Sequence, residues 1–325
     1  MALPSESSGF QYFHSVIVQA WASTMGVRSN SPKRRFSTNP DTKCQWDQED
    51  VPCSPEQEYP VQPPPYFRKL WLSFAFFMAA VTWNSMFQVI SESVVQPDNQ
   101  VLLIDVSHTL SNRFLSSFIP ASSIIDILLL VLLAMTIGAF AFLGPRSIAL
   151  VVLRRYLFLQ GIIFLIRGPA IYMTILPKTI TDPEECLFES SGSFIVDTVM
   201  VVLRQKVTCT DLFFSGHTAM ITLWAILITW HIFPKSFITP MQRYIYTVFM
   251  TTFWSLTIFV VSMIALTKFH YSIDVYVGVL LPLILTCAYY DVVTTIPFLQ
   301  SGAVSLSPTQ AIVMWLEDDS GYGTI

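Results

Sequence analysis

Two short polar clusters interrupt the apolar stretches of this 325-residue chain. One contains His217, and the other contains His270 and Asp274, which are four residues apart. On a helix that spacing puts both side chains on one face, where the carboxylate can accept a hydrogen bond from the imidazole. Such a carboxylate fixes the tautomer of the ring, raises its basicity and leaves the other nitrogen free to attack. The second cluster therefore predicts a nucleophile, His270, oriented by Asp274.

The first cluster offers an acid and an anion site. His217 can protonate a departing alkoxide and later deprotonate an incoming hydroxyl. Ser215 and Gly216 precede it at a predicted helix start, where unpaired N–H groups and the positive end of the helix dipole favour an anion such as phosphate. Gly216 lets the backbone come close to that anion. Taken singly, Ser215 is an ordinary cap and each histidine an ordinary interface residue, so the prediction of phosphate chemistry depends on their combination.

The elements that must position these residues are membrane helices. Hydrophobic residues make up 53% of the chain and charged residues 12%, and the mean hydropathy is +0.54, as in membrane proteins. The net charge of −4 without a long basic stripe argues against a nucleic-acid partner. We expect an all-α bundle of six transmembrane helices, because six stretches have the required length and apolarity, at approximately 70–90, 122–143, 156–176, 216–233, 244–266 and 273–296.

Three parts follow along the chain. Residues 1–65 are rich in Ser, Pro and Gln, and we expect a disordered cytosolic tail in which residues 10–25 form a short interfacial helix. No basic segment precedes that stretch, so it does not resemble a signal peptide, and the first span is expected to insert as its own signal. Residues 66–296 form the predicted six-helix catalytic domain, and residues 297–325 a cytosolic C-terminal tail.

The basic residues beside the predicted spans fix an orientation. They cluster before the first span, between the second and third, and between the fourth and fifth, at Arg68, Lys69, Arg146, Arg154, Arg155, Lys235 and Arg243. The positive-inside rule places these segments in the cytosol. An even number of spans then puts both termini in the cytosol, and His217 and His270 at the opposite, lumenal face.

Two short stretches of the sequence resemble the motifs of a known family, and a third stretch supports the resemblance. SGHT at 215–218 and HYSIDV at 270–275 resemble the paired signature of the sphingomyelin synthase and phosphosphingolipid synthase family, within the type-2 phosphatidic acid phosphatase superfamily. RRYLFLQGIIFLIRGPAIYMTILP at 154–177 resembles a third motif of that family, with its double arginine, later arginine and closing Leu-Pro. The three motifs occur in the family order and cover roughly residues 66–296.

The resemblance implies that His217, His270 and Asp274 form a lumenal catalytic triad, with Asp211 as a neighbour from the family motif. The chain departs from the family in two places. Family members commonly have Cys-Gly-Asp where this chain has Cys209-Thr210-Asp211. The proline-rich PLPD motif survives only as Gln96-Pro97-Asp98.

Further substrate-binding candidates flank the triad. Arg167, near the middle of the third span, is either a contact to the phosphate or headgroup or one half of an intramembrane structural pair. Lys268 stands where animal sphingomyelin synthases tend to carry an acidic residue and a histidine, and a basic residue there is similar to plant and protist inositol phosphorylceramide synthases. Tyr271 completes the set, with Asp211, Ser215 and Gly216.

The resemblance implies phosphoryl transfer in two steps through a phosphohistidine, without a metal ion or other cofactor. The phospho-headgroup passes from a glycerophospholipid to ceramide and diacylglycerol is released. Phosphatidylinositol is the favoured donor, with phosphatidylcholine and phosphatidylethanolamine still open. The organelle implied is the Golgi, with the endoplasmic reticulum and plasma membrane as alternatives, and a homo-oligomer is compatible with the sequence. Two other classes stay open: a lipid phosphate phosphatase with water as acceptor, and a non-enzymatic membrane protein.

The remaining cysteines and histidines give weaker signals. Five cysteines show no metal-ligand spacing. Cys186 and Cys209 share the predicted lumenal loop, so they either form a disulfide or stay as two free thiols. His231 and His108 have no comparable partners and are interpreted as an interface residue and a loop residue.

Overall fold

The structure is a computed structural model that describes residues 65–94, 103–114, 122–143, 146–177, 188–209, 211–232, 239–301 and 307–317. All regular secondary structure in these residues is helical. The tail predicted before residue 65, with its interfacial helix at 10–25, lies outside these residues, as do Gln96-Pro97-Asp98 and Thr210.

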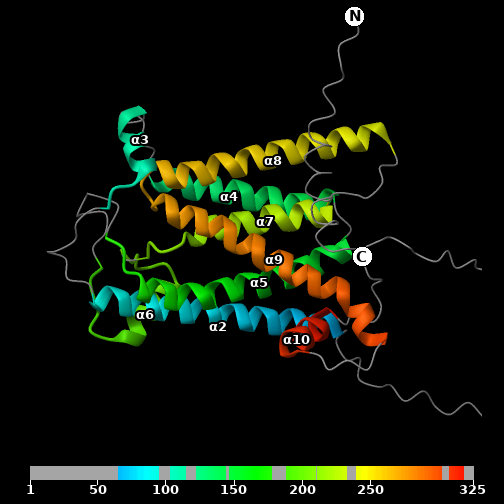
Figure 1. The fold of residues 1–325 in the computed structure, drawn as a ribbon, viewed down its shortest axis with the longest axis horizontal. Coiled ribbons are helices and arrows are strands. Elements are labelled where there is room, and N and C mark those ends of the chain that lie inside the picture. Colours follow the sequence, from blue (N-terminus) through cyan, green and yellow to red (C-terminus); the bar gives the residue numbers. More distant parts are fainter. Residues whose placement is uncertain are drawn as a thin grey trace, which may run out of the picture. The chain divides into compact units, whose positions relative to one another are not determined.

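Five described helices are long and apolar enough to cross a membrane. They are α2 (Pro65–Val94), α4 (Ser122–Gly138, continued by the π-helical segment η2, Ala139–Leu143), α5 (Arg146–Met173), α8 (Pro240–Leu266) and α9 (Ser272–Ser301). Each coincides with one of the predicted spans. The all-α membrane fold is therefore confirmed (Figure 1).

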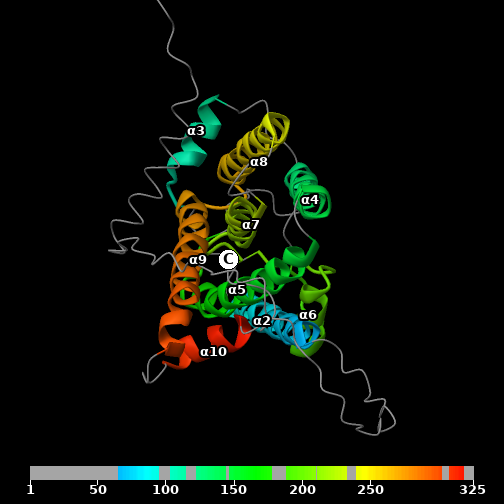
Figure 2. The same cartoon turned by 90° about the vertical axis from the view of Figure 1, so that its right-hand side faces the viewer.

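The remaining predicted span is α7 (Gly216–Ile232), which is shorter, with 17 residues. It packs against α4, α5, α8 and α9, and Figure 2 shows it near the middle of the bundle. Ile221, Leu223 and Ile228 are fully buried. A helix that is apolar around its whole circumference belongs inside a bundle, so neighbouring helices, rather than lipid, surround most of α7.

Among the described helices, α2 and α5 share the most extensive contact, and two glycines of α5 allow the helices to approach closely. A Cβ atom on Gly161 would lie 2.6 Å from the ring of Phe76, and one on Gly168 would lie 3.0 Å from the ring of Phe87. Small residues at such positions let membrane helices approach closely. The contact matters for the site, because α5 carries Arg167 next to Gly168.

Three shorter helices were not anticipated from the sequence. They are α3 (Val106–Phe114), α6 (Phe194–Val202) and α10 (Pro308–Glu317). The last lies in the predicted C-terminal tail, yet it docks on the bundle: the Glu317 carboxylate accepts hydrogen bonds from Arg155 at 3.0 and 2.5 Å and from the Tyr289 hydroxyl at 2.5 Å.

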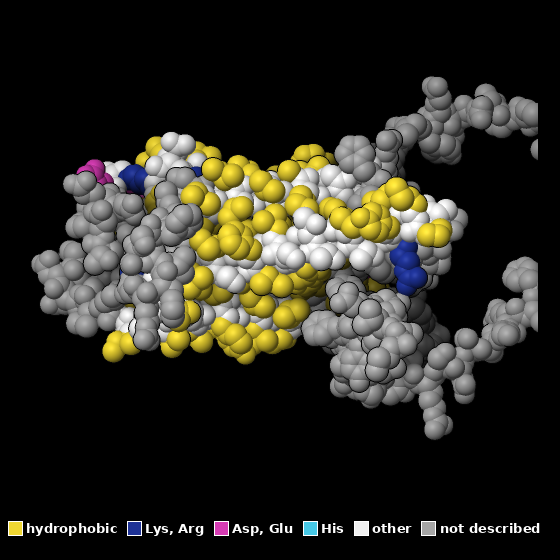
Figure 3. Space-filling model, turned by 90° about the horizontal axis from the view of Figure 1, so that it is seen from above, with side chains coloured by type: hydrophobic (Ala, Val, Ile, Leu, Met, Phe, Trp, Pro, Cys, Tyr) yellow, Lys and Arg dark blue, Asp and Glu magenta, His cyan; other side chains and the backbone are white. Residues whose placement is uncertain are grey.

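The long helices alternate in direction, so the starts of α2, α5 and α8 lie at one end and the starts of α7 and α9 at the other (Figure 1). Arg68, Lys69, Arg146, Arg154, Arg155 and Arg243 therefore lie in the first parts of α2, α5 and α8, toward the end opposite to His217 and His270, whereas Lys235 lies outside the described residues. Hydrophobic side chains cover the middle of the bundle, with charged ones toward both ends (Figure 3). This is the surface of an integral membrane protein; which end faces the cytosol stays a prediction.

Candidate active site

The site forms where the starts of α7 and α9 are joined through their backbones. The Ser215 N–H donates to the carbonyl of Asp274 at 3.0 Å. The Ser215 hydroxyl accepts from the Thr218 N–H at 3.2 Å, which caps α7. A Cβ atom on Gly278 would lie 2.9 Å from the Ser215 carbonyl oxygen, so only glycine allows this approach. The two predicted clusters are therefore brought together, at one end of the bundle.

His270 has a different acceptor from the one expected. Its Nδ1 lies 3.1 Å from the carbonyl oxygen of Leu212, which can only accept, so Nδ1 carries the proton and Nε2 has the free lone pair. Asp274 instead accepts from the N–H of Tyr271 at 3.2 Å. The four-residue spacing fails because α9 begins at Ser272, so His270 precedes the helix and does not share its face with Asp274.

Burial keeps the His270 imidazole neutral. The side chain is 3% exposed, and this burial lowers its pKa to about 3, helped by electrostatic interactions with His217 and Arg167. The hydrogen bond to Leu212 acts in the opposite direction and is the weaker influence. At neutral pH the imidazole is thus in the unprotonated form that a nucleophile requires.

Phe269 lies between the two candidate histidines. Its ring meets the His217 ring edge-on, with centroids 5.6 Å apart, and the His270 ring at 5.2 Å. The guanidinium of Arg204 lies 3.5 Å from Nε2 of His217. Arginine can only donate, so that nitrogen is an acceptor in this state. Arg204 thus adds an exposed cation beside His217, and no motif or spacing in the sequence indicates this contact.

Arg167 and Asp211 bind each other beneath the start of α7. The Arg167 Nη2 lies 2.5 Å from the Asp211 carboxylate, and its Nε donates to the Phe214 carbonyl at 2.9 Å. A Cβ atom on Gly216 would lie 3.3 Å from the guanidinium carbon. Gln88 donates to the other Asp211 oxygen at 2.5 Å. These contacts favour the structural pair among the two interpretations of Arg167.

The loop that this pair holds is strained. Phe214 has φ of 26°, an unusual value for a bulky residue, and its side chain is 2% exposed. Such backbone persists where surrounding contacts over-determine it, often at functional sites. Here the Arg167 bond to the Phe214 carbonyl holds the strained peptide directly before Ser215. The helix start is therefore fixed in place before any anion arrives.

A second set of hydrogen bonds, from Asp105 and His108, holds the segment that contains His270, and the sequence did not predict it. The Asp105 carboxylate accepts from the N–H of Ser107 at 2.8 Å and from the N–H and hydroxyl of Ser272 at 2.9 and 2.8 Å. Nε2 of His108 donates to the carbonyl of His270 at 3.2 Å. Burial raises the Asp105 pKa, but the hydrogen bonds from Ser107, Ser272 and His108 outweigh it and lower the value to about 2. His108, interpreted as a loop residue, thus supports His270.

Tyr271 and Lys268, two substrate-binding candidates, differ in their contacts with the rest of the protein. The Tyr271 hydroxyl donates to the Pro177 carbonyl at 3.0 Å, and its ring packs on His108. Lys268 has φ of 61° just after the end of α8 and makes no ion pair with the described residues. Their roles toward a substrate stay predictions.

Two of the five cysteines, Cys209 and Cys287, lie within the described residues. Cys209 is disulfide-bonded, while Cys186 lies outside the described residues, so the pairing of these two stays a prediction. Cys287 is free. Among the described residues no group of three or more His, Cys, Asp or Glu side chains could hold a metal ion.

A comparison with known protein families matches the part of the chain that contains both polar clusters. Residues 208–292 match the family model described as PAP2 superfamily C-terminal, a range that contains both polar clusters. The match supports the type-2 phosphatidic acid phosphatase superfamily and, with the membrane helices, an integral membrane enzyme with phosphatase or phosphotransferase chemistry on lipids. No curated protein sequence matches the chain.

Proposed function

We propose that the protein is a phosphosphingolipid synthase that moves a phospho-headgroup from a glycerophospholipid to ceramide and releases diacylglycerol. The observation that carries the proposal is the state of His270. Its imidazole is buried, neutral and fixed through Nδ1 to the Leu212 carbonyl, so Nε2 is the nucleophilic atom. His217, close enough to influence the charge on His270, is the acid-base partner.

The first step forms a phosphohistidine. Nε2 of His270 attacks phosphorus, the bond from phosphorus to the diacylglycerol oxygen breaks, and His217 gives that oxygen its proton. The negative charge of a bound phosphodiester favours the protonated His217 that this step needs. The N–H groups of Gly216 and His217 have no intrahelical acceptor, and with the Arg204 guanidinium they are suited to hold the phosphoryl oxygens.

The second step reverses the roles of the groups. The primary hydroxyl of ceramide attacks phosphorus, its proton passes to His217, and the bond from phosphorus to His270 breaks. His270 returns to its neutral form and His217 to its protonated form. No net proton is lost over the two steps, and no cofactor enters them.

Burial of the site favours transfer over hydrolysis. The His270 side chain is 3% exposed and Asp274 is fully buried. A nucleophile shielded in this way is poorly accessible to bulk water, while a lipid alcohol reaches it from the membrane. The alternative is a lipid phosphate phosphatase that uses the same histidines, with water as the acceptor.

The headgroup assignment depends on Lys268. An ammonium group with no ion pair among the described residues suits a polyol or anionic headgroup better than choline, whose cation prefers aromatic faces or carboxylates. We therefore favour phosphatidylinositol as donor, with phosphatidylcholine and phosphatidylethanolamine as the other donors to test. The Golgi is the proposed location.

The test is transfer to fluorescent ceramide by the purified full-length protein, offered the three donors separately. We expect one new phosphosphingolipid, absent with His270→Ala. Phosphate release from lysophosphatidate without any ceramide product would replace the proposal with a phosphatase. Equal lipid turnover by wild type and His270→Ala would rule out both enzymes.

A further inference from the structure

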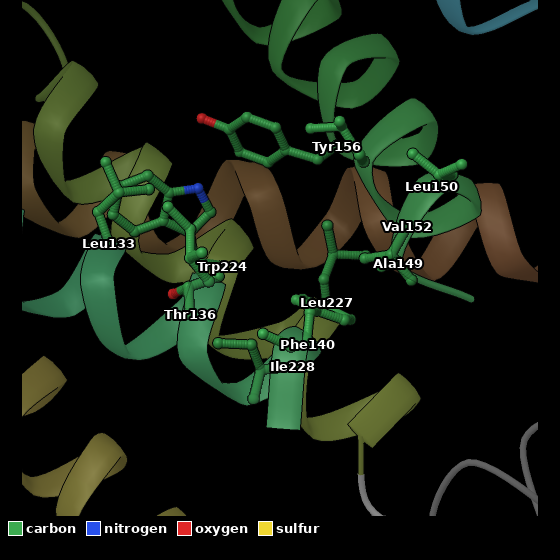
Figure 4. Close-up of a pocket in the computed structure, with 13 residues that line it drawn as sticks. Leu133, Thr136, Phe140, Ala149, Leu150, Val152, Tyr156, Trp224, Leu227 and Ile228 are labelled. Carbon is green, nitrogen blue, oxygen red and sulfur yellow. The ribbon is translucent and has the colours of Figure 1, made fainter. Parts of the chain in front are cut away.

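An apolar pocket of about 650 Å³ lies between α4, η2, α5 and α7, within the membrane-spanning part of the bundle (Figure 4). This is within the size range of small-molecule sites in proteins. Its lining includes Leu133, Phe140, Leu150, Val152, Leu227 and Ile228. The pocket is separate from the polar groups of the candidate active site.

The polar side chains in this lining are already satisfied by protein partners. The Thr136 hydroxyl donates to the Leu132 carbonyl at 2.8 Å. The Tyr156 hydroxyl is hydrogen-bonded to Trp224, and these two rings form one wall of the pocket. Each of these polar side chains thus has a partner within the protein, and the lining contains no charged side chain that could pair with a headgroup. The chemical class that fits is a hydrocarbon chain.

The pocket is open toward the bilayer. Ile137 of α4 and Leu153 of α5 belong to its lining and are 61% and 44% exposed. In the hydrocarbon core of a membrane these side chains face lipid tails. A chain can therefore enter sideways between α4 and α5 without crossing the polar end of the protein.

The pocket also lies on the same face of α7 as His217. Trp224 and Ile228 follow His217 by seven and eleven residues, spacings that return to one side of a helix. At 1.5 Å per residue they lie roughly 10 and 16 Å farther along the helix axis. A lipid whose reacting oxygen is at His217 would extend its chain along this face, toward the pocket.

We infer that the pocket binds the distal part of the acyl chain of the lipid alcohol that reacts at His217, and that it sets the preferred chain length. The inference rests on the proposed function, in which His217 protonates the leaving diacylglycerol and later deprotonates ceramide. Both alcohols place their oxygen at the same imidazole, so they use the same chain site in turn. The N-acyl chain of ceramide is the occupant to be tested.

The experiment compares ceramides with short and long N-acyl chains, using purified full-length variants in nanodiscs. Ala149→Phe puts a ring into the lining, and we expect it to lower the long-chain to short-chain turnover ratio by about tenfold, as small steric changes in apolar sites do. Ala134→Phe is the matched control, because Ala134 is exposed on α4 outside the lining, and its ratio should equal wild type. Leu133→Ala enlarges the pocket and should raise the ratio.

Two measurements distinguish failure of the inferred acyl-chain site from failure of the proposed function. A long-chain ceramide with a photoreactive group at the end of its acyl chain should cross-link to α5 residues around Ala149 in wild type, and less in Ala149→Phe, whether or not turnover occurs. Wild-type transfer with equal ratios in all variants would overturn the chain site while the enzyme assignment stands. Loss of a co-purified bilayer phospholipid from Ala149→Phe, with an unchanged ratio and unchanged cross-linking, would assign the pocket to bulk lipid and also overturn the inference.

Discussion

Nδ1 of His270 donates to the backbone carbonyl of Leu212 at 3.1 Å, and this bond replaces the carboxylate partner that the sequence spacing indicates. A carbonyl oxygen fixes the tautomer as well as a carboxylate does, but it carries no full negative charge. The proposed nucleophile is therefore oriented by a group that does not strongly raise its proton affinity. The segment before α7 thus supplies the orienting group, and Asp274 shapes the turn at Tyr271 instead.

The lowered pKa of His270 predicts how stability depends on pH. Its folded-state pKa of about 3 lies below the ordinary value of 6.5, so the unfolded chain binds this proton more readily. The contribution is fully present above pH 6.5 and is lost progressively as the pH falls toward 3. We expect His270→Gln to lose less stability than wild type between pH 7.5 and pH 5, measured by thermal unfolding in detergent. Parallel losses in the two proteins would contradict the assignment.

The pKa of His270 also predicts how the rate of phosphohistidine formation depends on pH. Because His270 stays neutral well below pH 6.5, formation of the phosphohistidine in a single turnover should not decline through a His270 titration between pH 7 and 5. Acid-quenched samples with a radiolabelled headgroup phosphate measure this step. Because this step needs His217 in its protonated form, that residue gives no reason for a decline at lower pH, and a rate that falls between pH 7 and 5 would refute the prediction.

The ion pair between Arg167 and Asp211 predicts strong coupling between two substitutions. Arg167→Gln leaves a carboxylate at 25% side-chain exposure without its main partner, and Asp211→Asn leaves a buried guanidinium. Each should destabilise the fold by about 2–3 kcal/mol, at the low end for broken buried pairs because Asp211 is partly exposed. The double variant should be less destabilised than the sum. Additive effects in this cycle would show that the pair is not coupled.

His108 should act as a positioning residue. It contacts the His270 carbonyl and no reacting atom in the proposed mechanism. We expect His108→Ala to slow phosphohistidine formation about tenfold with little change in ceramide KM, and His108→Gln, which keeps an N–H donor, to restore most of the rate. A purely structural role would lower the yield of folded protein without this difference between the two variants.

The bonded state of Cys209 gives a test for its partner. If Cys186 is that partner, Cys186→Ser and Cys209→Ser should each destabilise the protein by about 2–4 kcal/mol, and the double variant should lose no more than either. Thermal unfolding with and without reductant measures the loss. If Cys209 has no free thiol in the Cys186→Ser variant, its partner is another cysteine.

The long helices and both polar clusters could be predicted, because apolar length and residue type are properties of local sequence. The start of α7 followed from Ser215 and Gly216, and the start of α9 from the apolar stretch at 273–296. Contacts that depend on tertiary packing could not be predicted. The Leu212 carbonyl has no side-chain signature, and Arg204 lies on a different segment from His217. His108 gained its role only when α3 folded against the His270 loop.

The docking of α10 also bears on synthesis of the chain. Arg155 belongs to α5, but its carboxylate partner, Glu317, follows all of the long apolar helices in the sequence and is therefore translated after them. Until then the guanidinium in the third predicted span lacks the acceptor that it has in the finished protein. Completion of the bundle is therefore tied to translation of α10, and a chain that stops before it would present to cellular quality control a cation with His231 and Tyr290 as partners but no carboxylate.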